Sequence, residues 1–128
     1  EDAEVAKKAG RTLAAFYIPS MPPALLVRHD IDPAEVAPIS RAFAEGDVRG
    51  ALEATPGDIA DRLMVAGTPE SWARWLNDVY GPAGLEHALV SFTDPFTLRS
   101  WAEVEVPGLP TLLEQVRLLG EQVLPALS

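Results

Sequence analysis

Two short apolar runs on either side of one helical segment constrain the fold of this chain most. Residues 63–66 are continuously apolar, as in a strand buried on both faces, and Gly67 permits the turn that ends the run. Thr68 and Pro69 suit the first positions of the helix that follows, and residues 87–92 form the second run. This order predicts one βαβ unit with parallel strands and a right-handed crossover.

The rest of the chain predicts helices. Apolar residues at spacings of three and four favour an amphipathic helix over residues 3–16. Capping signals predict further helices over residues 33–45, 48–54, 55–62 and 112–123, and a short one is expected over 24–28. Pro38 predicts a kink or a restart. Residues 96–110 carry no assignable pattern.

Two strands against about six helices leave a sheet with two unpaired edges, and each buried strand group without a partner costs about 1–3 kcal/mol. We therefore expect the missing strands on residues outside this chain or on a second copy. The alternative is a set of helices packed around two strands. The chain has no initiator methionine and is expected to be part of a longer polypeptide.

Composition excludes several classes of protein. Nineteen acidic against ten basic residues give a net charge of −9, and no stripe of Lys and Arg occurs, so neither a nucleic-acid nor a membrane partner is expected. No apolar run approaches the roughly 20 residues that span a bilayer. The absence of cysteine excludes disulfides and thiolate sites and fits a cytoplasmic location.

A succession of segments carries a resemblance to a known family. The segments are AAFYIPSMPP, DPAEVAPISRAFAEGD and ADRLMVAGTPESWARWLNDVYGPAGLEHALVSF. In this order they resemble the C-terminal part of luciferase-like flavin- or deazaflavin-dependent oxidoreductases, in particular the methylenetetrahydromethanopterin reductase branch. The resemblance implies an α/β fold, the C-terminal portion of a (β/α)₈ TIM barrel. Residues 1–128 would be one unit, with a helical segment over 1–62 and the last two βα units over 63–128.

The resemblance also implies a function. The full-length form would be an oxidoreductase that uses coenzyme F420 (a deazaflavin) or FMN for hydride transfer or monooxygenation of a small-molecule substrate. The family's main ring contacts and phosphate-binding loops come from earlier strands, so this chain alone is expected to be inactive. It is expected to form a homo-oligomer or to associate with the missing part of the barrel. The alternative function is a non-catalytic α/β fragment or interaction module that self-associates.

Candidate site residues follow from the same resemblance, because TIM-barrel chemistry occurs at the C-terminal ends of the strands. Gly67 and Thr68 would contact the cofactor, and Phe92 and Asp94 would contact the substrate. Arg28 would reach an anionic substrate from the helical segment. Each residue also has a structural interpretation, since Gly67 and Thr68 suit an ordinary helix cap and Arg28 suits a solvated surface. No catalytic residue is identified.

Three other groupings of residues do not predict a functional site. His29 with its neighbouring aspartates lacks the further ligands of a metal site, and no metal is expected. His87 and Ser91 would lie about 13 Å apart on a strand, which is too far for a hydrolase triad with Asp94. The helical spacing of Trp72 and Trp75 favours packing in the core over stacking on a ligand.

Overall fold

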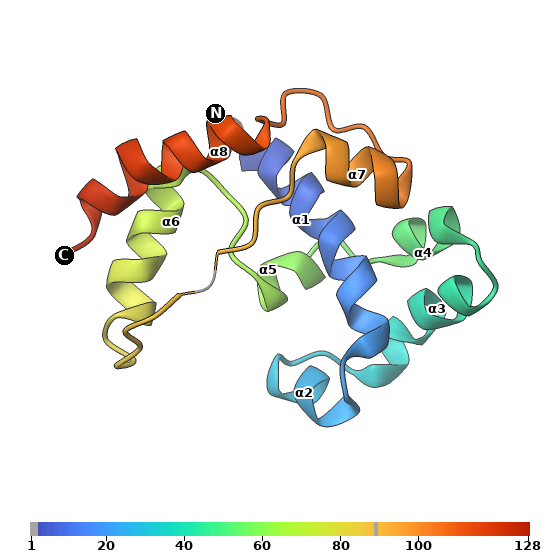
Figure 1. Ribbon diagram of the computed structural model, residues 1–128. Coiled ribbons are helices and arrows are strands. Elements are labelled where there is room, and N and C mark those ends of the chain that lie inside the picture. The colour runs from blue at the N-terminus through green and yellow to red at the C-terminus, as the bar shows by residue number, and fades with distance from the viewer. Residues whose placement is uncertain (1–2, 89) are drawn as a thin grey trace.

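The structure, a computed structural model, describes residues 3–88 and 90–128 and consists of helices joined by loops (Figure 1). Within these residues, no helix has the length and apolar character needed to cross a membrane. The helices, in chain order, are α1 (Ala3–Tyr17), η1 (Ile18–Ser20), α2 (Pro23–Arg28), α3 (Pro33–Ala44), α4 (Val48–Ala54), α5 (Ile59–Leu63), α6 (Pro69–Trp75), η2 (Leu76–Tyr80), α7 (Pro95–Ala102), α8 (Leu112–Leu118), η3 (Leu119–Val123) and η4 (Leu124–Ala126).

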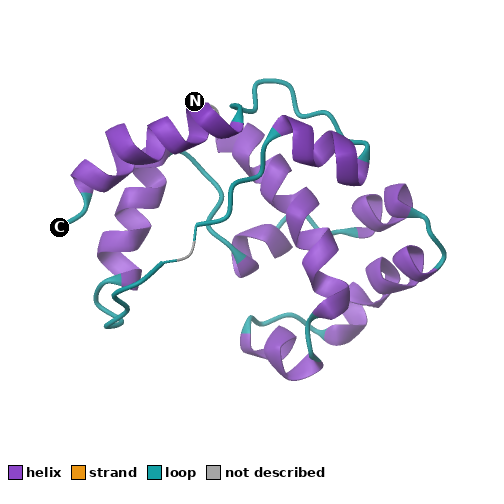
Figure 2. Ribbon diagram, in the orientation of Figure 1, coloured by secondary structure: helices purple, strands orange, loops and turns teal. Residues whose placement is uncertain are grey.

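The predicted α/β fold with two parallel strands is wrong. None of the described residues lies in a strand, and residues 64–66, 87–88 and 90–92 run as loops (Figure 2). Leu63 ends α5, and residues 64–66 continue without a sheet partner; in the second segment, Leu89 lies outside the described residues. A continuous apolar segment can be covered by helices as well as by neighbouring strands. Its apolar character alone therefore does not establish that it pairs in a sheet. The α/β classification and the two C-terminal βα units are therefore corrected, over the described residues, to helices joined by loops.

The starts of α3, α4 and α8 were predicted correctly, because each depends on a local hydrogen bond. The start predicted at residue 55 is wrong, since α5 begins at Ile59 and has no side-chain cap. The Asp32 side chain accepts a hydrogen bond from the backbone N–H of Ala34 at the start of α3, and Asp47 does the same for Gly50 in α4. At α8, Thr111 and Glu114 form the predicted capping box. The helix α3 continues through Pro38, so the restart that this proline suggested does not occur.

The main core lies among α1 to α5. Ile18, Ile39 and Ile59 are almost completely buried there, and α3 packs on α4 while α1 packs on α5 (Figure 1). Arg11 ties α1 to α4, since its guanidinium donates to the backbone carbonyl of Thr55. These contacts make α1 the element around which the first half of the chain is built.

The second half of the chain surrounds the other side of α1. The helix α7 packs on α1 through a smaller core in which Ala9, Leu98 and Val106 are buried. The helix α6 lies beside α8 and packs on η3 (Figure 1). Asn77 holds the last residues of the chain, because its amide donates to the carbonyl of Ala126 at 2.8 Å and accepts from the N–H of Ser128 at 3.0 Å.

Two helices change from α to π geometry before they end. The segment η2 extends α6, and η3 extends α8, each over five residues. The π-helix is rare and is found mostly as single turns inside α-helices, frequently at functional sites. Leu76 and Tyr80 of η2 and Leu119 and Val123 of η3 all line the cavity described below.

Candidate functional site

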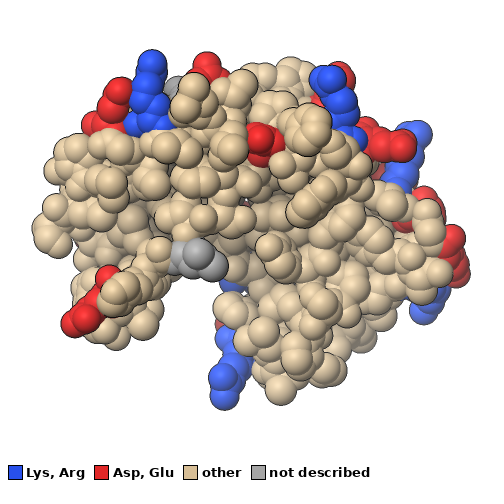
Figure 3. Space-filling view, viewed as in Figure 1, with Lys and Arg blue, Asp and Glu red and all other residues tan. Residues whose placement is uncertain are grey.

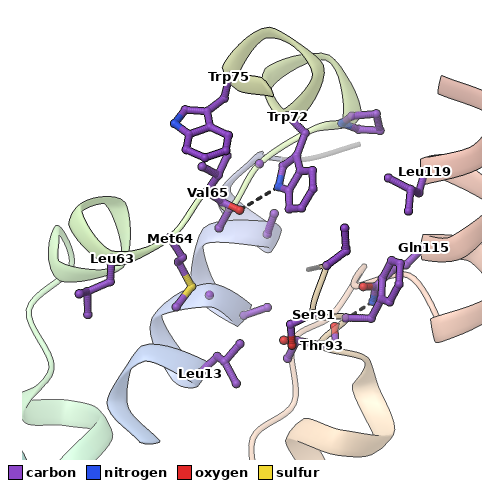
Figure 4. A pocket seen from close by; sticks show the side chains of 18 of the residues that line it. Leu13, Leu63, Met64, Val65, Trp72, Trp75, Ser91, Thr93, Gln115 and Leu119 are labelled. Atoms are coloured by element: carbon purple, nitrogen blue, oxygen red, sulfur yellow. Dashed lines mark hydrogen bonds between the residues drawn. The ribbon is translucent and has the colours of Figure 1, made fainter. Parts of the chain in front are cut away.

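A cavity of about 700 Å³ lies between α1, α6 and the continuous helix formed by α8 and η3 (Figure 4). Its wall includes Leu63 at the end of α5 and the loop segments 64–67 and 90–93, as well as these helices. Most of its lining side chains are apolar. A cavity of this size and composition falls in the range of about 300–1,000 Å³ that is typical of small-molecule sites.

A glycine in α1 brings one wall of the cavity close to that helix. A Cβ atom at Gly10 would lie 2.8 Å from the Cβ of Ala66 and 3.3 Å from the Sδ of Met64. Such contacts are too short for an ordinary Cβ, so only glycine lets residues 64–66 lie directly on α1. Glycine costs about 1 kcal/mol in a helix interior, and at this position the close approach accounts for its presence.

The loop that follows α5 is fixed by a tryptophan. Trp72 of α6 donates its indole N–H to the backbone carbonyl of Val65 at 2.8 Å (Figure 4). Nearby, the rings of Trp75 and Tyr80 lie 5.4 Å apart, and the Tyr80 hydroxyl donates to the carbonyl of His87. Trp72 and Trp75 are half-buried and both line the cavity, so they are more than the core residues that their spacing predicted.

A glutamine fixes the opposite loop. The side-chain amide of Gln115 in α8 donates to the carbonyls of Thr93 and Pro110, each at 2.8 Å. Both loops that form the cavity wall are therefore held by side chains of the helices on either side of it. Because these bonds join backbone atoms of loops to helices, they fix the shape of the cavity in the absence of a sheet.

The structure places two of the five predicted site residues in the cavity wall, Gly67 and Phe92. Thr68 is not part of the wall, because its side chain caps α6 by accepting from the N–H of Ser71. A Cβ at Gly67 would lie 2.3 Å from the Oγ of Ser71, which donates to the Thr68 carbonyl. The geometry of the helix cap alone accounts for the residue types at 67 and 68.

The other two predicted residues lie outside the wall. Asp94 caps α7, and its Oδ1 accepts from the N–H of Thr97 at 2.7 Å. That backbone hydrogen bond, assisted by one from the Thr97 side chain, lowers the pKa of the Asp94 carboxyl below its usual value. Arg28 ends α2 with an exposed side chain. Neither Asp94 nor Arg28 is brought together with Gly67 and Phe92.

Sequence reasoning missed the residues that α1 and α8 contribute, among them Gly10, Leu13 and Gln115. Their positions in the wall depend on how helices distant in sequence pack. The interior glycine of α1 was the one available signal. His29 also lies in the wall, with its Nδ1 3.2 Å from the carbonyl oxygen of Arg62. Among residues 3–88 and 90–128, no group of three His, Asp or Glu side chains could hold a metal ion.

Two curated proteins resemble the chain, and both are named 5,10-methylenetetrahydromethanopterin reductase. The protein from Methanolobus tindarius is 37% identical over 83 residues, which cover 62% of this chain and 24% of the relative. The protein from Archaeoglobus fulgidus is 23% identical over an alignment that covers 100% of this chain and 35% of the relative. The chain thus spans about a quarter to about a third of the relatives' lengths. No protein-family model and no solved structure matches it.

The cofactors implied by the resemblance, F420 and FMN, are only partly compatible with this cavity. Its aromatic and aliphatic wall suits a planar ring system. Both cofactors also carry phosphate, and no Lys or Arg is among the described residues of the wall. Arg62 has its guanidinium on Glu35 and Asp58, at 3.1 and 2.7 Å. The described residues therefore fit the ring and not the anionic group.

Proposed function

We propose that this chain is a segment of an oxidoreductase that reduces a methylene-pterin in the manner named for its two relatives, with reduced F420 as the electron donor and FMN as the second choice. The alignment over the whole chain with the Archaeoglobus fulgidus reductase carries this proposal. The apolar cavity supports it, because residues 63–67 and 90–92 of the wall belong to the stretch on which the family resemblance rests.

The segment would contribute apolar wall to the site, and the groups that bind phosphate would come from other polypeptide. Because the wall offers no charged side chain among its described residues, the residues seen here bind and enclose a ring and exclude water from one side of it. No proton-transfer role is assigned to any of them.

The test is a spectrophotometric assay of the native polypeptide that contains these residues. With reduced F420 present, we expect its oxidation to depend on added 5,10-methylenetetrahydromethanopterin. The same assay with reduced FMN distinguishes the two cofactors. Failure of the pterin to stimulate the oxidation of either cofactor would reject the reductase proposal.

A second candidate function, self-association without catalysis, is favoured by the outer faces of α7 and α8. Phe96 is 77% exposed and Leu113 is 79% exposed, and Trp101 and Val116 are exposed as well. Exposed large apolar side chains become an interaction site where a second copy of the chain covers them. Size-exclusion chromatography with light scattering tests this function, since a concentration-dependent dimer mass supports it and a monomer mass at all concentrations contradicts it.

A further inference from the structure

A second cavity, of about 370 Å³, lies between α1, α4 and the loop that follows α7. It is separate from the apolar cavity, because α1 lines the two with different residues and no described residue belongs to both walls. Its volume falls in the range of about 300–1,000 Å³ that is typical of small-molecule sites. The two helices contribute Lys8, Arg11 and Thr12 from α1 and Arg49, Leu52 and Glu53 from α4.

The second cavity gathers positive charge in an acidic protein. Residues three and four positions apart lie on one face of a helix, so α1 presents Lys8 and Arg11 together and α4 presents Arg49 and Glu53 together. Three cationic side chains and one carboxylate give the described wall a net charge of +2, whereas the whole chain carries −9. The charge of the second cavity is thus opposite in sign to that of the chain.

Arg11 holds one of these charges in a fixed position. Its Nε donates to the backbone carbonyl of Thr55 at 2.7 Å, and its Nη2 donates to that of Leu52 at 3.3 Å. Both acceptors are backbone carbonyls at the end of α4, so the guanidinium keeps its full positive charge. In the part of the chain that the structure describes, neither Arg11 nor Lys8 forms an ion pair with a carboxylate.

Many of the other cations are matched by acids. Figure 3 shows Lys and Arg side chains beside Asp or Glu at several points along the edge of the molecule. Arg49 also has such a partner, since its Nε lies 3.0 Å from a carboxylate oxygen of Glu53, but these two side chains are 90% and 67% exposed. An exposed pair of this kind contributes little free energy, so Arg49 can exchange Glu53 for another anion at small cost.

We propose that the second cavity binds the phosphate group of a small molecule, a doubly charged oxyanion that matches the net charge of the wall. Guanidinium and ammonium groups form their strongest hydrogen bonds with phosphate and carboxylate oxygens. The Thr12 hydroxyl already donates to the Lys8 carbonyl at 3.1 Å, so the cations supply the binding free energy. The inference uses the face of α1 that is turned away from the apolar cavity, and it holds whether or not the larger protein is a reductase.

Calorimetric titration of the native polypeptide with inorganic phosphate tests the proposal, with acetate as the singly charged comparison and succinate as the dicarboxylate. At low ionic strength we expect saturable binding of phosphate that weakens as sodium chloride is added. Acetate and succinate should each bind at least about fivefold more weakly. The proposal is overturned if phosphate does not bind, or if acetate or succinate binds as tightly as phosphate.

Two substitutions with opposite expected effects locate the phosphate. A unit charge about 4 Å from an anion in water changes its affinity about fivefold, equivalent to about 1 kcal/mol. We therefore expect Lys8→Gln to raise the dissociation constant of phosphate about fivefold and Glu53→Gln to lower it by a similar factor. Both side chains are exposed, so neither substitution disturbs the core. Arg11 is left intact, because it joins α1 to α4.

The ion pair of Arg117 and Glu121 supplies matched controls. Its two side chains are 68% and 62% exposed and lie outside the second cavity. Arg117→Gln and Glu121→Gln change the net charge by the same amounts as Lys8→Gln and Glu53→Gln, and we expect both to leave phosphate binding unchanged. Equal effects in the controls, or no effect of Lys8→Gln and Glu53→Gln, would show that phosphate binds elsewhere and would reject the second cavity as its site.

Discussion

Replacing Asp94 distinguishes a structural from a ligand-binding role for the residue that sequence reasoning assigned to the substrate. Its carboxylate accepts from the N–H of Thr97 at 2.7 Å and begins α7. Removal of an N-cap side chain costs about 1 kcal/mol, within a range of about 0.5–2 kcal/mol. We therefore expect Asp94→Ala to lower the free energy of unfolding by about 1 kcal/mol, which for a chain of 128 residues lowers the Tm by about 4 °C.

Thermal and urea unfolding followed by circular dichroism measure this change. Asp94→Asn is the matched control, because an amide oxygen still accepts the capping hydrogen bond and should recover most of the lost stability. Wild-type stability in Asp94→Ala, together with a loss of pterin-dependent cofactor oxidation by the native polypeptide, would refute the capping argument and restore the substrate role.

The pH dependence of the same variants gives an independent check. Because the hydrogen bonds from Thr97 lower the pKa of Asp94 in the folded protein, its ionised carboxylate stabilises the fold at pH values above the ordinary aspartate pKa. This stabilisation is lost as the pH falls through the lowered folded pKa. The stability of the wild type relative to Asp94→Asn should therefore decrease over that acidic range and stay constant around neutral pH.

Two further substitutions test the packing around the cavity and the core. In Gly67→Ala the new Cβ would lie 2.3 Å from the Oγ of Ser71, so the serine must rotate and lose its hydrogen bond to the Thr68 carbonyl. We expect urea denaturation to show a free energy of unfolding lower by about 1 kcal/mol, and the added change Ser71→Ala should not lower it further. Additive effects of the two substitutions would contradict this contact. Ile39→Ala truncates a side chain that is 0% exposed and should lower the free energy of unfolding by about 2–5 kcal/mol in the same measurement. A decrease below about 1 kcal/mol would show that the core is not packed as described.

The features predicted correctly from the sequence are those determined by neighbouring residues. The caps at Asp32, Thr68 and Thr111 depend on side chains within three residues of the N–H groups that they bind. The start of α7 carries the same signal, Asp94 followed by Pro95, although no helix is predicted over residues 96–110, which carry no assignable pattern.

The failed predictions depend on contacts between distant residues. An apolar run such as residues 63–66 must be covered, and the sequence does not say whether a neighbouring strand or the surface of α1 covers it. The answer depends on Gly10, more than fifty positions away, whose missing side chain lets Ala66 approach the helix. The predictions of site residues were also right only in part: Gly67 and Phe92 lie in the cavity wall, and Arg28 and Asp94 do not.

The two π-helical turns, η2 and η3, allow the lining of the cavity to change through the deletion of one residue, which no substitution can imitate. Each ends its helix with wider turns than α geometry has, so deleting one residue there could restore ordinary α geometry instead of breaking the helix. Such a deletion would rotate the last side chains of the helix, Tyr80 or Val123 among them, about the helix axis and present different groups to the cavity. Homologous proteins could thereby acquire new ligand preferences through a loss of length, with the surrounding helices unchanged.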